Sequence, residues 1–193
     1  DMPTKPEDRI LLRAITEMTD RLNKKHGSGF IAAVRPRAFS ETQNEFIGRE
    51  KKRGAITELI RAVKGKSKGF SLLYGDIAEL GKTKYIIALD ADTGLVFDCA
   101  RELVAIAEHP VNRPVIKDGR VVRGYGLLVP KSENSLKEKN GTFFSAVMAG
   151  DSGVAAYDTL TNERYQDLFA EGIFCGKGLI NVDAFYTLLD KGM

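Results

Sequence analysis

The chain has 193 residues, of which 43% are hydrophobic and 28% are charged, so it is long enough to bury a core and has an ordinary globular composition. Its formal net charge of +3 is too small to indicate nucleic-acid binding by itself. The cysteines, Cys99 and Cys175, lie far apart and are accompanied by only two histidines, which argues against a disulfide framework and a zinc site and favours reduced thiols.

The chain begins at Asp1 without a starting methionine, and we expect it to be an excised part of a longer protein. It contains no signal peptide and no apolar run of membrane-spanning length, so we expect this piece to be soluble.

The first half predicts helices and short strands in alternation. Residues 7–22 place apolar side chains at helical spacing and predict a packing helix. Residues 30–34 predict a buried strand and residues 69–74 a second one, while residues 39–48 are polar and predict a loop. Residues 55–63 carry the apolar face of another helix.

Four basic residues, Arg49, Lys51, Lys52 and Arg53, gather at the start of that helix. A helix start favours anions, so cations placed there suggest an anionic partner. A solvated basic face is the simpler alternative. Further basic residues up to position 68 leave RNA binding open, although aromatic residues are not interleaved with them.

Residues 84–93 form the most informative stretch. A continuous apolar run ends in Asp90 and Asp92, as a buried strand does where it reaches the carboxyl edge of an α/β sheet. Because side chains alternate along a strand, the two carboxylates can share one hard cation such as the Mg²⁺ of a bound diphosphate. In the alternative interpretation, one aspartate caps the next helix and the other belongs to a turn.

Beyond this strand the sequence predicts further elements. They are a helix over residues 100–107, a loop over 112–119, a strand over 121–129, a polar loop over 131–140, a helix over 142–148 and a closing helix over 182–189.

The segment of residues 165–178 is the second unusual stretch. Gly172, Gly176 and Gly178 suggest close approach of the backbone to a ligand, with Lys177 available to neutralise a phosphate. Asp167 and Glu171 are candidates to contact an acceptor hydroxyl. A glycine-rich turn with surface carboxylates is the alternative.

Three blocks resemble processive, metal-dependent glycosyltransferases of the A-type fold. Residues 52–56 resemble the Lys-Ala-Gly-Ala-Leu-Asn element of cellulose-synthase-like enzymes, which lies against the nucleotide-sugar in that family. Asp90-Ala91-Asp92 matches the Asp-x-Asp metal motif, and residues 174–176 resemble the Phe-Cys-Gly-Ser element that precedes the catalytic base.

A closer resemblance, which covers most of the chain, is to the glycosyltransferase domain of cyclic β-1,2-glucan synthase. The blocks that carry it are residues 49–54, 89–93, 109–114, 124–126, 165–169, 176–178 and 182–185.

The resemblance implies UDP-glucose as donor, a growing β-1,2-glucan as acceptor and Mg²⁺ or Mn²⁺ as cofactor. It implies Asp90 and Asp92 as metal ligands, with Lys52, Arg53, Asp90, Gly176 and Lys177 at the donor. The parent would be a large membrane protein with its transferase on the cytoplasmic side of the inner membrane, and no nucleic acid is expected as partner.

The expected fold is α/β, a mostly parallel open sheet with flanking helices that forms part of an A-type transferase fold in a single domain over residues 1–193. The family's first strand, its catalytic-base motif and its Gln-x-x-Arg-Trp motif are missing, and the chain has no tryptophan. We therefore expect the piece to be inactive alone. A non-catalytic glucan-binding or interaction module is the alternative function.

Overall fold

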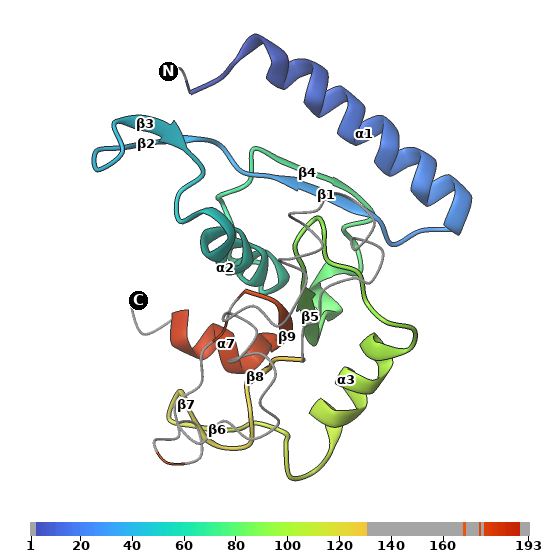
Figure 1. Cartoon of the computed structure of the whole chain (residues 1–193), viewed down its shortest axis with the longest axis vertical. Helices are drawn as coiled ribbons and strands as arrows, with labels where there is room; N and C mark the ends of the chain where they lie inside the picture. The colour runs from blue at the N-terminus through green and yellow to red at the C-terminus, as the bar shows by residue number, and fades with distance from the viewer. Residues whose placement is uncertain (1–2, 131–167, 169–173, 175, 190–193) are drawn as a thin grey trace, which may run out of the picture. The chain divides into compact units, whose positions relative to one another are not determined.

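The computed structural model describes residues 3–130, 168, 174 and 176–189 (Figure 1). This part of the chain is a mixed α/β structure with four α-helices and one short 3₁₀ turn. The helices are α1 (Pro6–His26), α2 (Lys51–Val63), α3 (Cys99–Glu108) and α7 (Val182–Leu189), with the 3₁₀ turn η1 at Leu80–Lys82. The strands are β1 (Ile31–Val34), β2 (Ala38–Ser40), β3 (Glu45–Ile47), β4 (Leu72–Gly75), β5 (Tyr85–Ala88), β6 (Val115–Lys117), β7 (Arg120–Arg123), β8 (Leu127–Leu128) and β9 (Gly178–Asn181).

The chain divides into two compact units, each made of separate segments. The first unit comprises Asp1–Ile86, Pro110–Gly126 and Ile180–Met193, and the second comprises Ile87–His109 and Leu127–Leu179. Each unit has its own buried apolar residues. In the first they are Ala32, Ile60, Val63, Ile180, Val182 and Ala184, and in the second Ala88, Leu103, Ala107 and Leu179. The expected single domain stays a prediction.

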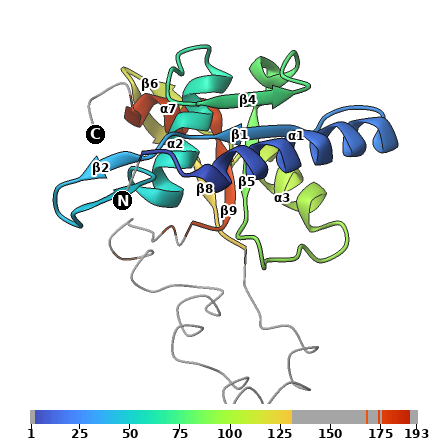
Figure 2. The same ribbon diagram turned by 90° about the horizontal axis from the view of Figure 1, so that it is seen from above.

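Helix α1 has clear start and stop signals in the sequence. Pro6 occupies the first turn, where its missing N–H costs nothing, and Asp8 accepts a hydrogen bond of 2.8 Å from the backbone N–H of Lys5. Gly27, at φ +96°, ends the helix. The helix lies along the β1–β4 pair, as Figures 1 and 2 show.

The packing of α1 differs from the sequence prediction. Thr19 is its buried residue, and its hydroxyl donates to the Ile15 carbonyl at 2.8 Å. By contrast, Ile10 is 72% exposed and Leu11 57% exposed. The predicted helix is therefore present, but its neighbours in the described structure cover a different stripe from the apolar one.

Strands β1 and β4 are the two predicted strands around residues 30–34 and 69–74, and they pair antiparallel with Val34 opposite Leu72 and Ile31 opposite Gly75. The pairing of the two strands ends at Gly75, where steric crowding requires a glycine. Gly75 has φ +108°, and a Cβ there would come within 2.3 Å of the Phe30 carbonyl oxygen.

The expected mostly parallel open sheet is not what the described residues form. Their strands make four small sheets, and the pairs β1–β4, β2–β3 and β6–β7 are all antiparallel. The remaining sheet has the strand order β5-β9-β8. A short apolar run predicts a strand but not its direction, which depends on pairing with distant segments.

One hairpin and the first strand of another occupy segments that were predicted as loops, whereas the single strand predicted over residues 121–129 is divided into β7 and β8. Strands β2 and β3 pair across residues 38–47, and β6 and β7 pair across residues 115–123. Asp118 and Gly119 connect the second pair, with φ +51° and +65°. Positive φ at both positions is typical of the Asp-Gly hairpin turn, so the sequence did contain a signal for it.

No helix in the described part of the chain is both long enough and apolar enough to cross a membrane.

Candidate functional site

Strand β5, at one edge of the three-stranded sheet β5-β9-β8, leads to the two candidate metal ligands. It ends at Ala88, which is buried, and the chain then turns with the Thr93 N–H donating to the Asp90 carbonyl at 3.1 Å. Asp90 is half-buried and Asp92 is exposed. Neither caps the following helix, because the N-cap of α3 is Asp98. The predicted strand before the carboxylates is therefore present, but it is less buried than expected: Ala88 is buried, while Tyr85, Ile86 and Ile87 are half-buried.

Lys177 lies beside the first of these carboxylates. Its Nζ is 3.5 Å from Asp90 Oδ2, and the two side chains are 36% and 40% exposed. Two residues predicted at the donor from distant parts of the sequence are therefore in contact within the second unit.

The position of Lys177 follows from strand β9. All four residues of β9 are buried, and the strand is next to β5 in its sheet. Gly178 has φ +139°, and a Cβ on it would come within 2.4 Å of the Leu128 carbonyl oxygen in β8. Only glycine fits there, so the backbone that carries Lys177 is held close to β8. The predicted Gly176 also has positive φ, +82°.

The described side chains supply only part of the oxygen ligands that a hard cation requires. Asp90 and Asp92 supply carboxylate oxygens, the ligand type that Mg²⁺ and Mn²⁺ prefer. The described residues contain no group of three or more His, Cys, Asp or Glu side chains that could hold a metal ion by themselves. Mg²⁺ is commonly bound by one or two carboxylates together with substrate phosphates and water, and the aspartate pair is compatible with that arrangement.

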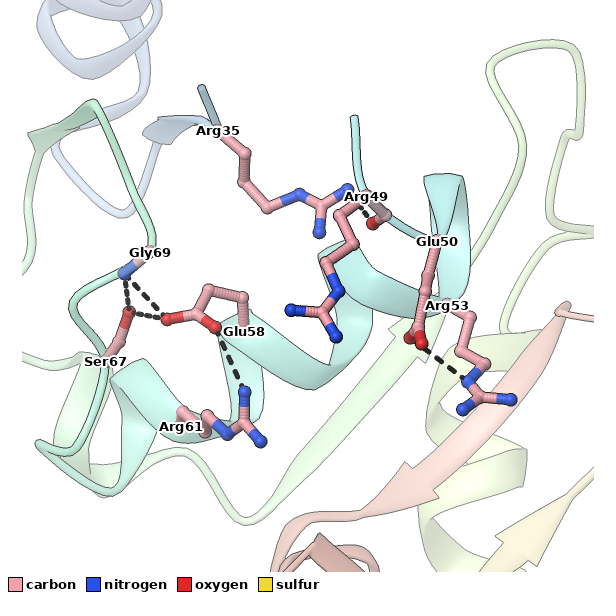
Figure 3. A network of polar contacts seen from close by, with 8 residues as sticks. All are labelled: Arg35, Arg49, Glu50, Arg53, Glu58, Arg61, Ser67 and Gly69. Carbon is pink, nitrogen blue, oxygen red and sulfur yellow. Dashed lines mark hydrogen bonds and ion pairs between the residues drawn. The ribbon is translucent and has the colours of Figure 1, made fainter. Parts of the chain in front are cut away.

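The basic start of α2, in the first unit, holds the other predicted donor residues. Glu50 is its N-cap with φ +55°, and Lys51 follows with φ +42°, with no side-chain capping hydrogen bond from Glu50. Arg53 Nε forms an ion pair with Glu50 at 3.3 Å and remains 69% exposed (Figure 3). Lys52 is half-buried on the same turn.

Arg35, which was not predicted as a site residue, forms hydrogen bonds with the backbone at the start of this helix. Its Nη2 donates to the Arg49 carbonyl at 2.9 Å, as Figure 3 shows. It also donates to the Lys51 carbonyl at 2.9 Å. A Cβ on Gly54 would lie 2.4 Å from Arg35 Nη1 and 2.2 Å from the Arg49 carbonyl oxygen. The glycine inside this helix is explained mainly by the closeness of the Arg49 carbonyl, a backbone group, and also by the Arg35 guanidinium. The glycine in the first turn of the predicted helix was the signal in the sequence that could have indicated this close contact.

An open groove lies at this helix start, with a volume of about 710 Å³. The hairpin β2–β3 and the beginning of α2 line it, so it belongs wholly to the first unit. Its lining includes the exposed aromatic ring of Phe39 and the side chains of Arg49 and Lys51. The groove therefore combines apolar surface with positive charge.

Two of the basic residues between positions 49 and 68, Arg61 and Lys64, pair with carboxylates of the chain itself. Partial burial by itself would raise the pKa of Glu58, but hydrogen bonds from Ser67 Oγ (2.5 Å) and the Gly69 N–H (2.8 Å), together with Arg61 at 3.4 Å, lower it below its usual value (Figure 3). Lys64 forms an ion pair with Asp183. These partners reduce the charge available to a nucleic acid.

The predicted site residues fall into three groups. Lys52 and Arg53 belong to the first unit, and Asp90, Asp92, Gly176 and Lys177 belong to the second. The predicted acceptor-side residues Asp167 and Glu171 lie outside the described residues, as does the helix predicted over residues 142–148.

Comparison with known proteins identifies a relative of the chain. No family model matches it. It is 33% identical, over 180 residues, to cyclic beta-(1,2)-glucan synthase NdvB of Rhizobium meliloti (strain 1021). The similarity covers 92% of the chain but only 6% of the length of that relative. The resemblance drawn from the sequence blocks is confirmed, and the chain is related to one segment of a cyclic β-1,2-glucan synthase.

Proposed function

We propose that the chain forms part of the donor site of a glycosyltransferase, one that transfers glucose from UDP-glucose to a growing β-1,2-glucan. The observation that carries this proposal is the contact of Asp90 with Lys177 just beyond strand β5, in a chain related to a cyclic β-1,2-glucan synthase. A carboxylate pair with an adjacent ammonium provides both kinds of charge that a metal-bound diphosphate requires.

The proposed reaction is an inverting displacement. The acceptor hydroxyl attacks the anomeric carbon, a general base that we place outside this chain takes the proton, and UDP leaves with the electron pair of the broken bond. Asp90 and Asp92 hold the metal, and a bound Mg²⁺ or Mn²⁺ supplies positive charge at the departing diphosphate.

The remaining residues have binding roles in this proposal. Lys177 lies next to the diphosphate, and Lys52 and Arg53 contribute positive charge for the diphosphate or the uridine. Asp167 and Glu171 act at the acceptor. In this proposal the chain alone is inactive, and the parent protein completes its A-type transferase fold. That parent acts on the cytoplasmic side of the inner membrane.

Calorimetric titration of UDP, with and without Mn²⁺, tests the donor-site proposal. We expect binding that depends on Mn²⁺ and is lost in the double variant Asp90→Asn, Asp92→Asn. Asp76→Asn is the matched control, because Asp76 directly follows strand β4 as the candidate pair follows β5, but lies in the other unit. Binding that survives in the double variant would contradict the metal assignment.

The alternative function, a non-catalytic glucan-binding module, predicts a different outcome. Such a module binds β-glucan oligosaccharide and is indifferent to UDP and Mn²⁺. Titration of the same protein with a glucan oligosaccharide separates the two hypotheses. In the full-length parent, Asp92→Asn should abolish sugar transfer if the donor-site proposal is correct.

A further inference from the structure

The ion pair of Asp90 with Lys177 joins two residues that the proposed function assigns to different parts of one ligand. Asp90 would face a divalent cation, and Lys177 would face a diphosphate. In the described structure the two side chains instead neutralise each other at 3.5 Å. The same lysine cannot pair fully with the carboxylate and with a phosphate, so its partner must change when a ligand arrives.

The surroundings of Lys177 allow such a change. Its backbone is held in place, because the next residue, Gly178, starts the buried strand β9 and fits closely against the Leu128 carbonyl. Its side chain is 36% exposed and ends in an ammonium on a flexible four-carbon stem. The ammonium can therefore leave the carboxylate without any movement of the strand.

We propose that Lys177 is an exchangeable counter-ion of the aspartate pair. Without ligand, its ammonium neutralises Asp90 and weakens the binding of a divalent cation alone. When a nucleoside diphosphate arrives with the cation, the metal takes over the carboxylate and the ammonium moves to the phosphate oxygens. This inference rests on the proposed function and adds the dependence of metal binding on the nucleotide.

The proposal predicts effects of opposite sign for one substitution. Lys177→Met removes the competing charge, so Mn²⁺ without nucleotide should bind more tightly. The same change removes a phosphate partner, so UDP in the presence of saturating Mn²⁺ should bind more weakly. An exposed ion pair of this kind corresponds to a change of up to about fivefold in each dissociation constant. A lysine with a purely structural role would not produce opposite changes.

The experiment measures free Mn²⁺ by electron paramagnetic resonance in titrations of the 193-residue chain, and UDP affinity by calorimetry. Lys177→Arg keeps the positive charge beside Asp90, so Mn²⁺ without nucleotide should not bind more tightly to it than to the parent chain. Lys82→Met is the matched control, because Lys82 also forms an ion pair with a carboxylate, Glu79 at 2.8 Å, but in the other unit. Circular dichroism verifies that each variant is folded, and Lys177→Gln serves if the methionine variant is not.

The outcomes distinguish this inference from the proposed function. Tighter Mn²⁺ binding together with weaker UDP binding in Lys177→Met supports it, as does Mn²⁺ binding that appears only in that variant. Equal or weaker Mn²⁺ binding overturns the inference, yet leaves the proposed function standing if the Asp90→Asn, Asp92→Asn variant still loses metal-dependent UDP binding. Unchanged metal-dependent binding in the double aspartate variant overturns both.

Discussion

Replacing Gly178 by alanine should be one of the most damaging single changes in the second unit. The new Cβ would come within 2.4 Å of the Leu128 carbonyl oxygen and 3.2 Å of the Val129 Cα, both backbone atoms of the neighbouring segment. The residue also has φ +139°, a conformation that side chains with a Cβ rarely adopt. Both penalties act on the same buried strand, β9.

The two costs can be estimated separately. Holding alanine in a sparsely populated backbone conformation costs about 1 to 3 kcal/mol. Moving close-packed neighbours to relieve an overlap costs about 1 to 3 kcal/mol more. We therefore expect the free energy of unfolding to fall by about 2 to 6 kcal/mol. With a urea dependence of about 2 kcal/mol per molar, the unfolding midpoint should fall by about 1 to 3 M.

Urea unfolding followed by far-UV circular dichroism measures this shift, with Gly94→Ala as control. Gly94 lies in the same unit, and a Cβ added to it would meet no atom within 4 Å. It also has no positive φ, so its replacement should change the free energy of unfolding by less than about 1 kcal/mol. Equal midpoints for Gly178→Ala and Gly94→Ala would refute the steric reasoning.

Two further predictions concern the first unit. Gly54→Ala should destabilise the chain by about 1 to 3 kcal/mol in the same assay, although alanine is the better helix former, because its Cβ would overlap the Arg49 carbonyl oxygen as well as the Arg35 guanidinium; a gain in stability would contradict this. Asp8→Asn should make the free energy of unfolding depend less on pH under acidic conditions. The Arg37 guanidinium and the Lys5 N–H lower the pKa of Asp8 from 3.8 to about 2, so the carboxylate stabilises the fold fully above pH 3.8, and this contribution is lost as the pH falls towards 2. Urea midpoints measured between about pH 5 and pH 2 compare the two proteins, and parallel profiles would rule out this role for Asp8.

Most helices of the described chain were predictable because their signals are local. The apolar spacing of residues 7–22 and of residues 182–189 corresponds to α1 and α7, and the basic segment before residue 55 indeed opens α2. The apolar run before Asp90 contains strand β5. In each case the repeat and the stop signal lie within the segment itself.

Pairing and packing were less predictable, because they depend on residues far apart in sequence. The antiparallel direction of β1 and β4, and the exposure of Ile10 on α1, follow from which segments meet in space. The Arg35 contacts with the α2 start connect residues 14 and 16 positions apart. At the candidate site, Lys177 was a predicted residue, but its contact with Asp90 was not predicted, because nothing in either motif specifies the other.

The division of the chain into interleaved segments has a consequence for its synthesis. The first unit includes Ile180–Met193, which leave the ribosome after every residue of the second unit. Its buried residues Ile180 and Val182 are therefore absent while Ile60 and Val63, which belong to the same core, are already made. The first unit cannot complete its core cotranslationally from its own amino-terminal part, and it must wait until the second unit has been synthesised in full.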